Sequence, residues 1–177
     1  MFKRINGFVE QIAERVATKV FFKELYEWYD GYEHIDWTPN IRVQLDEGAC
    51  LPTRAHGTDG GADLRCREAF TVPAGDSCVI DTGVHVQLPP HTVGMIKSKS
   101  GLNVRACLAT EGVIDEGYSG SIVVRLHNYG VYDYSFEAGD KVTQLVCIPV
   151  LYPDYVQVDE IEGGTRGSAG FGSTGRA

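Results

Sequence analysis

Five short segments of the chain combine glycine with the side chains that can bind phosphate or activate water. They span residues 61–64, 98–102, 112–120, 139–145 and 166–175. A carboxylate can orient and deprotonate an attacking water, and basic side chains and hydroxyl groups can bind phosphate oxygens. Taken alone, each segment also has a structural explanation. Asp115, for example, could cap backbone N–H groups in a turn.

The order and spacing of these segments resemble those of the homotrimeric dUTPase family. The third segment, Gly-Val-Ile-Asp-Glu-Gly-Tyr-Ser-Gly, and the fifth, Arg-Gly-Ser-Ala-Gly-Phe-Gly-Ser-Thr-Gly, carry most of the resemblance. The second departs from the family's Pro-Arg-Ser-Gly, with Ser98 for Pro and Lys99 for Arg. Lysine keeps the charge of arginine but not its bidentate contact with phosphate. The resemblance covers residues 40–177 and implies hydrolysis of dUTP to dUMP and pyrophosphate, in nucleotide-pool sanitation and dUMP supply.

By this resemblance, Asp115 is the catalytic carboxylate. It would activate a water for in-line attack on the α-phosphorus, so that pyrophosphate leaves on the opposite side. Gln144 would hold the same water or a phosphate. Ser100 would bond the α,β-bridging region, where negative charge accumulates as pyrophosphate leaves. The other phosphate-binding residues implied in the second segment are Lys99 and Gly101.

The resemblance also implies how the nucleoside is selected. A β-hairpin over about residues 102–114 would read uracil through backbone groups, and Tyr118 would pack under the deoxyribose and exclude a ribose 2′-hydroxyl. Ala109 stands near the position where some members place an Asn that bonds the base, so backbone groups or Thr110 would make that contact. The base- and sugar-binding residues implied are Thr110, Gly112, Val113, Ile114 and Tyr118.

The fifth segment lies in a glycine-rich tail without a hydrophobic pattern, which predicts a flexible C-terminal arm. In the family this arm closes over a site of another subunit, so the active sites lie between the chains of a homotrimer. Phe171 would stack on uracil while the closed arm excludes water. The arm residues implied to contact substrate are Arg166, Phe171, Gly172, Ser173 and Thr174. The tail also approaches the phosphate-loop pattern, but Arg176-Ala177 stands where Lys-Ser/Thr is needed.

The triphosphate implies Mg²⁺, which neutralises phosphate charge. We expect the substrate triphosphate and waters to hold the ion, with no direct protein ligand. Asp63 is the candidate outer-shell contact. The five histidines form no H-x-E or i,i+4 pair, so we interpret them as surface or packing residues.

Two other functions fit parts of the pattern. dCTP deaminases share the implied fold but carry a catalytic Glu on the strand after the third segment. Here the corresponding segment reads Ile122-Val-Val-Arg125, with a cation in place of the Glu, which argues against deamination. The second alternative is a regulatory trimer that binds a partner protein through its N-terminal helix. The intact Asp115 and arm argue that such a trimer would retain catalysis.

Short strands are expected to position the candidate residues. From Asn40 onward, alternating apolar and polar residues broken by Gly and Pro predict strands near 41–45, 78–88, 93–96, 121–126 and 142–151. Such a pattern is typical of an all-β sandwich, jelly roll or barrel. The resemblance specifies a dUTPase-like jelly-roll β-barrel over residues 39–160.

Residues 1–38 follow a different pattern. Between Phe2 and Tyr32, apolar residues recur at helical spacing with charged residues between them. We predict an N-terminal helical extension that packs on its own domain or on a neighbouring subunit. Binding of an unknown partner through this helix is the open alternative. The predicted division is thus an extension at 1–38, a barrel at 39–160 and the arm at 161–177.

The composition excludes several classes of partner. A net charge of −8 and a pI near 5.0 argue against nucleic-acid or anionic-membrane binding, which needs a basic face. No apolar run of about 18 residues is present, so no membrane span is expected. Five separated cysteines without a CxxC pair favour free thiols in a reducing cytoplasm. We therefore predict a cytoplasmic protein with dUTP as its ligand.

Overall fold

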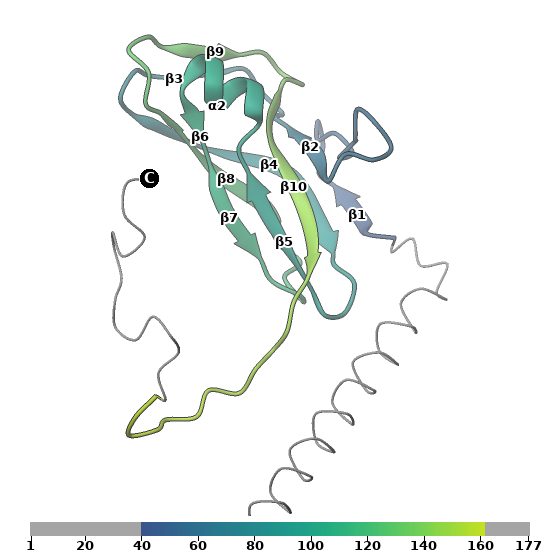
Figure 1. Cartoon of the computed structure of the whole chain (residues 1–177). Helices are drawn as coiled ribbons and strands as arrows, with labels where there is room; N and C mark the ends of the chain where they lie inside the picture. The colour runs from purple at the N-terminus through teal and green to yellow at the C-terminus, as the bar shows by residue number, and fades with distance from the viewer. Residues whose placement is uncertain (1–39, 162–177) are drawn as a thin grey trace, which may run out of the picture.

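Strands dominate residues 40–161, the part of the chain that the computed structural model describes (Figure 1). Within this part a single helix, α2 (Ser100–Ala106), lies between β5 and β6. Each of the predicted strand regions contains a strand, and the all-β prediction is confirmed. The strands are β1 (Arg42–Leu45), β2 (Gly61–Arg65), β3 (Phe70–Val72), β4 (Ser77–Gln87), β5 (Thr92–Lys97), β6 (Leu108–Ala109), β7 (Glu111–Ile114), β8 (Ser121–Asn128), β9 (Tyr134–Phe136) and β10 (Lys141–Pro149).

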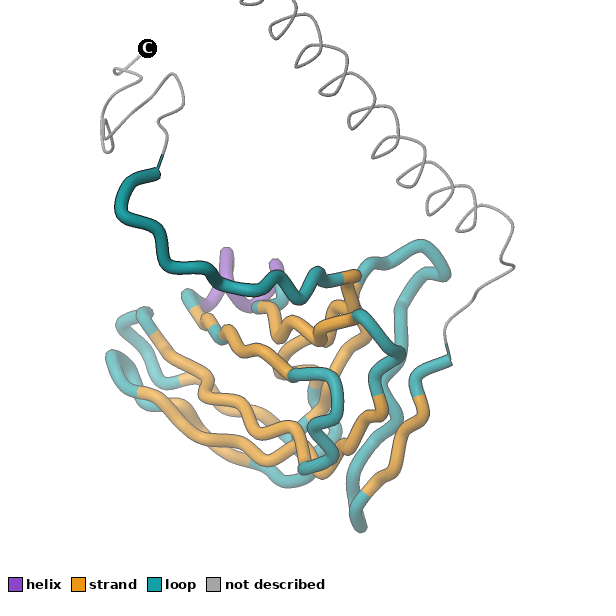
Figure 2. Tube along the Cα trace, turned by 90° about the horizontal axis from the view of Figure 1, so that it is seen from below, coloured by secondary structure: helices purple, strands orange, loops and turns teal. Residues whose placement is uncertain are grey.

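The strands form two four-stranded antiparallel sheets and one two-stranded ribbon. The strand order is β1-β4-β8-β6 in the first sheet and β2-β10-β5-β7 in the second, while β3 pairs with β9. The two larger sheets lie one over the other (Figure 2). Most paired strands are distant in sequence, as the crossing connections of a jelly roll require. This arrangement agrees with the predicted jelly roll.

Alternation along β8 shows how the sequence builds the core. Ile122, Val124 and Leu126 are at most 4% exposed. Val123 and Arg125 lie between them and are exposed, because successive side chains of a strand leave opposite faces. Buried side chains from both sheets join them in one core cluster, which includes Leu64, Ile80, Val84, Ile96, Val142 and Leu145.

A bulge interrupts the pairing of β4 with β8. Asp81 pairs with Val123 and His85 with Ser121, so three β4 residues stand where β8 has one. Gly83, inside this bulge, has a φ of +65°, and a Cβ there would lie 2.8 Å from the Arg67 side chain. The bulge therefore requires glycine at position 83.

The predicted β-hairpin over residues 102–114 is wrong. Residues 100–106 form α2, and Cys107 ends this helix with a φ of 55°. Strand β6 then pairs with β8, whereas β7 pairs with β5 in the other sheet. Leu102 and Ala106 are spaced i,i+4, so a helix turns both onto one face, where they pack against the core. This burial outweighs the low helix propensity of Gly101.

Two predicted features lie partly or wholly outside the described residues. The helical extension at 1–38 lies wholly outside, and the arm at 161–177 lies outside except for its first residue. Residues 150–161 leave β10 and extend away from the barrel (Figure 1). Their large apolar side chains are exposed, namely Leu151, Tyr152, Tyr155, Val156, Val158 and Ile161. In residues 40–161, no helix is long and apolar enough to cross a membrane.

Candidate functional site

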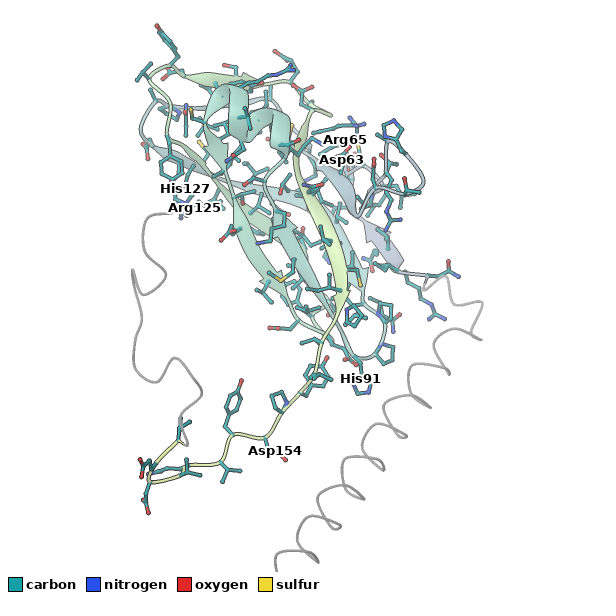
Figure 3. The ribbon with its side chains drawn as sticks, in the orientation of Figure 1. Asp63, Arg65, His91, Arg125, His127 and Asp154 are labelled. Atoms are coloured by element: carbon teal, nitrogen blue, oxygen red, sulfur yellow. The ribbon has the colours of Figure 1, made fainter. Side chains whose placement is uncertain are left out.

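At the end of the second sheet beside α2, the carboxylate of Asp63 pairs with two lysines. Lys141 Nζ lies 2.6 Å from one carboxylate oxygen, and Lys99 Nζ bonds the other. Figure 3 shows Asp63 next to Arg65 on β2. Burial raises the pKa of Asp63, but the hydrogen bonds and charges of Lys141 and Lys99 outweigh it and hold the pKa below its usual value. The ionised carboxylate therefore fixes Lys99 at the start of α2.

Replacing Asp63 with Asn is expected to lower the free energy of unfolding by about 1–3 kcal/mol at neutral pH, because two ammonium groups lose a buried partner. A lowered pKa means that the carboxylate stabilises the fold above its unfolded pKa of about 4 and that this contribution is lost as the pH falls through the folded pKa. The difference between wild type and variant should therefore shrink in acid. Chemical denaturation at neutral pH and near pH 3 measures it.

The matched control is Glu111→Gln, which removes an exposed ion pair in the same sheet. Lys97 Nζ lies 3.1 Å from Glu111, whose side chain is 79% exposed. An exposed pair of this kind contributes less than about 1 kcal/mol. Equal losses in the two variants would contradict the structural importance of Asp63.

Gln144 and Ser98 tie the strand ends together beside this ion cluster. Gln144 Nε2 donates a hydrogen bond to the Ser98 carbonyl at 3.0 Å. The Ser98 hydroxyl donates to the Thr110 carbonyl at 3.0 Å and accepts from the Thr110 amide at 2.9 Å. The Gln144 side chain lies over Gly61, where a Cβ would overlap the amide oxygen of Gln144. Gly61 therefore leaves the space that this amide occupies.

The hydroxyl group of Thr110 is buried without a hydrogen-bond partner. Thr110 is 2% exposed, and among residues 40–161 its Oγ1 is the buried side-chain polar atom left unsatisfied. Such atoms are rare because they lose hydration without compensation. The other implied base-binding residues follow directly on β7, where Gly112 is partly buried, Val113 exposed and Ile114 buried.

Asp115 begins an exposed turn after β7. The Tyr118 amide donates to the Asp115 carbonyl at 3.1 Å, and Gly117 has a φ of +88° that favours glycine. The Tyr118 hydroxyl folds back and donates to the Ser121 carbonyl at 3.0 Å. A Cβ at Gly120 would overlap the Tyr118 ring. Gly117 and Gly120 thus permit the turn that places the Asp115 carboxylate and the Tyr118 ring.

A cavity of about 400 Å³ lies beside Asp115. Glu116 borders it and accepts hydrogen bonds from the His91 amide at 2.8 Å and from the Tyr152 hydroxyl. The Tyr152 bond lowers the pKa of Glu116, and the carboxylate in turn raises the pKa of Tyr152. The start of the C-terminal segment is therefore tied to the Asp115 turn. The cavity is lined by Thr92, Val93, Asp115, Glu116, Gly117, Val150 and Tyr152.

The two groups of candidate residues lie at opposite ends of β5 and β7 (Figure 1). Asp115 lies at the cavity beside Val93, whereas Gln144 pairs with Lys97 at the α2 end. Four residue steps along β5 separate these positions, which is about 13 Å at 3.3 Å per residue. Asp115 and Gln144 of the same chain therefore lie at different ends of the sheet.

The described residues do not build a metal cage. In residues 40–161, no group of three or more His, Cys, Asp or Glu side chains is close enough to hold a metal ion. Asp63, the candidate outer-shell contact, is already paired with Lys99 and Lys141. A metal ion at this site would therefore need oxygen ligands from another source.

A family model described as dUTPase matches residues 47–175 of the chain. The chain belongs to the dUTPase family. This membership confirms the resemblance and the enzyme class implied by the five segments. The matched region includes all five segments, and the barrel described above forms the larger part of it.

Curated relatives and solved structures agree with the dUTPase assignment. A deoxyuridine 5'-triphosphate nucleotidohydrolase from Gloeothece citriformis is 40% identical over 136 residues, covering 75% of this chain and 94% of the relative. One from Clostridium acetobutylicum is 39% identical over 140 residues, covering 77% and 97%. The Staphylococcus bacteriophage 80alpha dUTPase with dUPNHPP has a TM-score of 0.73 and 30% identity, covering 78% of this chain and 100% of that one. A dUTPase variant from phage phi11 of S. aureus, described with a structural Mg(II) ion, has a TM-score of 0.66 and 29% identity, covering 71% and 100%.

Within this dUTPase chain the structure gathers some candidate residues and separates others. Lys99, Ser100 and Gly101 lie at the start of α2, with Gln144 on the neighbouring strand. Asp115 and Tyr118 share the turn at the other end. The arm residues lie outside the described part, namely Arg166, Phe171, Gly172, Ser173 and Thr174.

Sequence reasoning missed several contacts of these residues. The pairing of Lys141 with Asp63 and the bond from Tyr152 to Glu116 join positions that are distant in the chain. Lys141 lies inside the fourth segment, so its charge was a usable signal. No local pattern marks Tyr152, because its partner is set by the path of the chain after β10.

Proposed function

We propose that this chain hydrolyses dUTP to dUMP and pyrophosphate, with Asp115 activating a water for in-line attack on the α-phosphorus. The observation that carries the proposal is the exposed Asp115 carboxylate, which borders a cavity of about 400 Å³ on the turn that also presents Tyr118. An exposed carboxylate can accept the proton of a bound water. The reaction removes dUTP and supplies dUMP, which fits nucleotide-pool sanitation.

The α2 end supplies the groups that would bind the phosphates. Asp63 holds the ammonium group of Lys99 there, and Ser100 and Gln144 lie beside it. Two lysines around one carboxylate leave a local positive charge, which suits an anionic ligand. In our proposal Ser100 bonds the α,β-bridging region, and Gln144 binds the attacking water or a phosphate.

Strand β7 and the turn after it would bind the base and the sugar of the nucleotide. The Thr110 hydroxyl has no hydrogen-bond partner among residues 40–161, which leaves it as a candidate contact for the base. Backbone groups of Gly112, Val113 and Ile114 would read the rest of uracil. The Tyr118 ring, which stands at the end of this row, would pack under the deoxyribose and exclude a 2′-hydroxyl.

A homotrimer would bring the two ends of the site together. Asp115 and Gln144 of one chain are about 13 Å apart along β5, so in our proposal a second chain supplies one of them to the attacked α-phosphorus. Exposed apolar side chains, among them Val113 at 57% and Val123 at 52%, fit contact with other subunits. The arm would then reach a neighbouring site, where Phe171 stacks on uracil and Arg166, Gly172, Ser173 and Thr174 contact the substrate.

We expect Mg²⁺ to enter the site on the substrate. The described residues offer no cage of carboxylate and imidazole ligands, whereas a triphosphate supplies several oxygens. The ion would neutralise phosphate charge. Asp63 remains the candidate outer-shell contact.

Pyrophosphate release from dUTP, dCTP, dTTP and UTP tests the proposal, with each nucleotide assayed with and without Mg²⁺. We expect rapid release from dUTP alone and a strong dependence on the metal. Comparable rates on all four nucleotides would contradict the selection by β7 and Tyr118. Absence of release from dUTP would contradict the function itself.

Deamination of dCTP is not favoured by the structure. Arg125 lies on the outer face of β8 and donates to the Ser77 hydroxyl at 3.0 Å (Figure 3). A guanidinium stays protonated at neutral pH and cannot shuttle protons as a carboxylate can. We therefore expect no ammonia release from dCTP.

Replacing Gly61 with Ala is expected to lower kcat for dUTP by roughly ten- to a hundredfold, because the new Cβ displaces the Gln144 amide and misplacement of about 1 Å is costly in catalysis. The cost in stability should stay small, since the displaced group is the end of a flexible side chain. Gly60→Ala is the matched control, because a Cβ at Gly60 meets no atom within 4 Å. Equal kcat in both variants would exclude Gln144 from the site.

A further inference from the structure

His85 connects the turn that carries Tyr118 to the end of β1. Its Nδ1 lies 2.8 Å from the Ser119 carbonyl oxygen, and its Nε2 lies 3.2 Å from a carboxylate oxygen of Asp46. A carbonyl oxygen only accepts hydrogen bonds, so Nδ1 donates to Ser119. The ring can donate to both partners only as an imidazolium, because neutral imidazole carries a single N–H.

Polar groups from three segments hold His85 in place. Asp81, in the β4 bulge, bonds the Ser121 hydroxyl and accepts from the Gly83 amide at 2.9 Å. Arg67 lies 2.9 Å from Asp81 and 3.8 Å from the carboxylate that His85 contacts. The His85 side chain is 22% exposed. The charged groups that act on the ring are Asp46 and Asp81, and Arg67 lies beside both carboxylates.

Ser119 is part of the platform on which Tyr118 rests. It stands between Tyr118 and Gly120, and the Tyr118 ring lies against Gly120. The Tyr118 hydroxyl donates to Ser121, two residues beyond Ser119, at 3.0 Å. A shift of the Ser119 carbonyl therefore moves the backbone that supports the ring.

We propose that His85 is a positioning residue for sugar selection, which holds the turn at residues 118–121 and thereby fixes the Tyr118 ring. The inference rests on the proposed function, in which this ring packs under the deoxyribose. His85 itself does not touch the reacting atoms. Its loss should therefore weaken the binding of dUTP and its discrimination from UTP more than it slows the chemical step.

The same geometry predicts a dependence on pH. The hydrogen bond to Ser119 raises the pKa of His85, desolvation opposes this, and Asp46 adds to the increase. A raised pKa means that both contacts are complete at low pH. As the pH rises through the folded pKa, a single N–H is left for two acceptors, so the bond to Ser119 is held in only part of the molecules. The KM for dUTP should therefore rise with pH somewhat above about 6.5.

Two substitutions separate the contacts of the ring. The amide nitrogen of Asn can replace Nδ1 and keep the bond to Ser119, whereas that of Gln replaces Nε2 and loses it. We expect His85→Gln to raise the KM for dUTP about three- to tenfold, the ratio for one lost hydrogen bond, with kcat within about twofold. The dUTP-to-UTP preference should fall by a similar ratio. His85→Asn should stay near the low-pH wild-type KM, and neither variant should show the wild-type pH dependence.

The experiment measures kcat and KM for dUTP and UTP from about pH 6 to pH 9, with His127→Gln as control. His127 stacks on Tyr129 with ring centroids 5.8 Å apart. Hydrogen exchange of residues 117–121, measured on the same proteins, reports the turn without any substrate. An unchanged KM, preference and pH profile in His85→Gln would overturn the inference while dUTP turnover persists. Lack of dUTP turnover in wild type would instead overturn the proposed function, and exchange would then show whether His85 holds the turn.

Discussion

Replacing Asp115 with Asn is expected to lower kcat for dUTP by about a thousandfold, the middle of the range for removal of a general base. The amide has the size of the carboxylate but cannot accept a proton from water. Binding of a non-hydrolysable dUTP analogue should stay within about threefold of wild type, because the loss falls on the transition state alone. Pyrophosphate release and calorimetric titration with the analogue measure the two quantities.

The matched control for this experiment is Asp154→Asn. Asp154 is exposed on the segment after β10 and lies away from the barrel (Figure 3). It should retain wild-type turnover. Full activity in the Asp115→Asn variant would remove this carboxylate from the mechanism. Loss of analogue binding together with turnover would indicate that Asp115 shapes the pocket rather than activating water.

Mixing two inactive variants should restore activity if each site draws on two chains. Ser100→Ala removes a group at the α2 end and is expected to cost at least about a hundredfold in kcat. Co-refolded with an equal amount of Asp115→Asn, it should recover roughly a quarter of wild-type activity, because a quarter of the sites in randomly mixed trimers combine two intact halves. The measurement is specific activity of the mixture against each variant alone.

A second mixture provides the control for complementation. Asp115 and Tyr118 lie on one turn of one chain, so mixing Asp115→Asn with Tyr118→Ala cannot rebuild a complete turn. We expect no recovery there. Lack of recovery in both mixtures would mean that one chain holds a whole site, against the separation of about 13 Å along β5. Recovery of activity in both mixtures would show that Asp115 and Tyr118 do not have to come from the same chain.

Local patterns predicted five of the described strands correctly in position, namely β1, β4, β5, β8 and β10. The alternation along β4 and β8 follows from burial of one face, and the structure bears it out. Gly117 and Gly120 lie in the same segment as Asp115 and Tyr118, so the backbone requirements of the turn are local. The roles of these residues in catalysis are still predictions.

The region between the second and third segments shows where the family resemblance implied the wrong local structure. The resemblance implied a β-hairpin over residues 102–114. The structure instead forms α2, because Leu102 and Ala106 reach the core together only on a helix. The choice between a hairpin and a helix in this region therefore depends on the core, which other parts of the chain contribute.

The amino-acid sequence by itself determined the family, the strand-rich fold and the residues able to carry the chemistry, because these depend on residue types at short spacing. Tertiary structure alone decided that Asp63 holds Lys99 and Lys141, that His85 reaches Ser119, and that Asp115 and Gln144 stand at opposite ends of one sheet. These facts depend on strand pairing and register, which are set by burial of the whole core. No short segment contains that information.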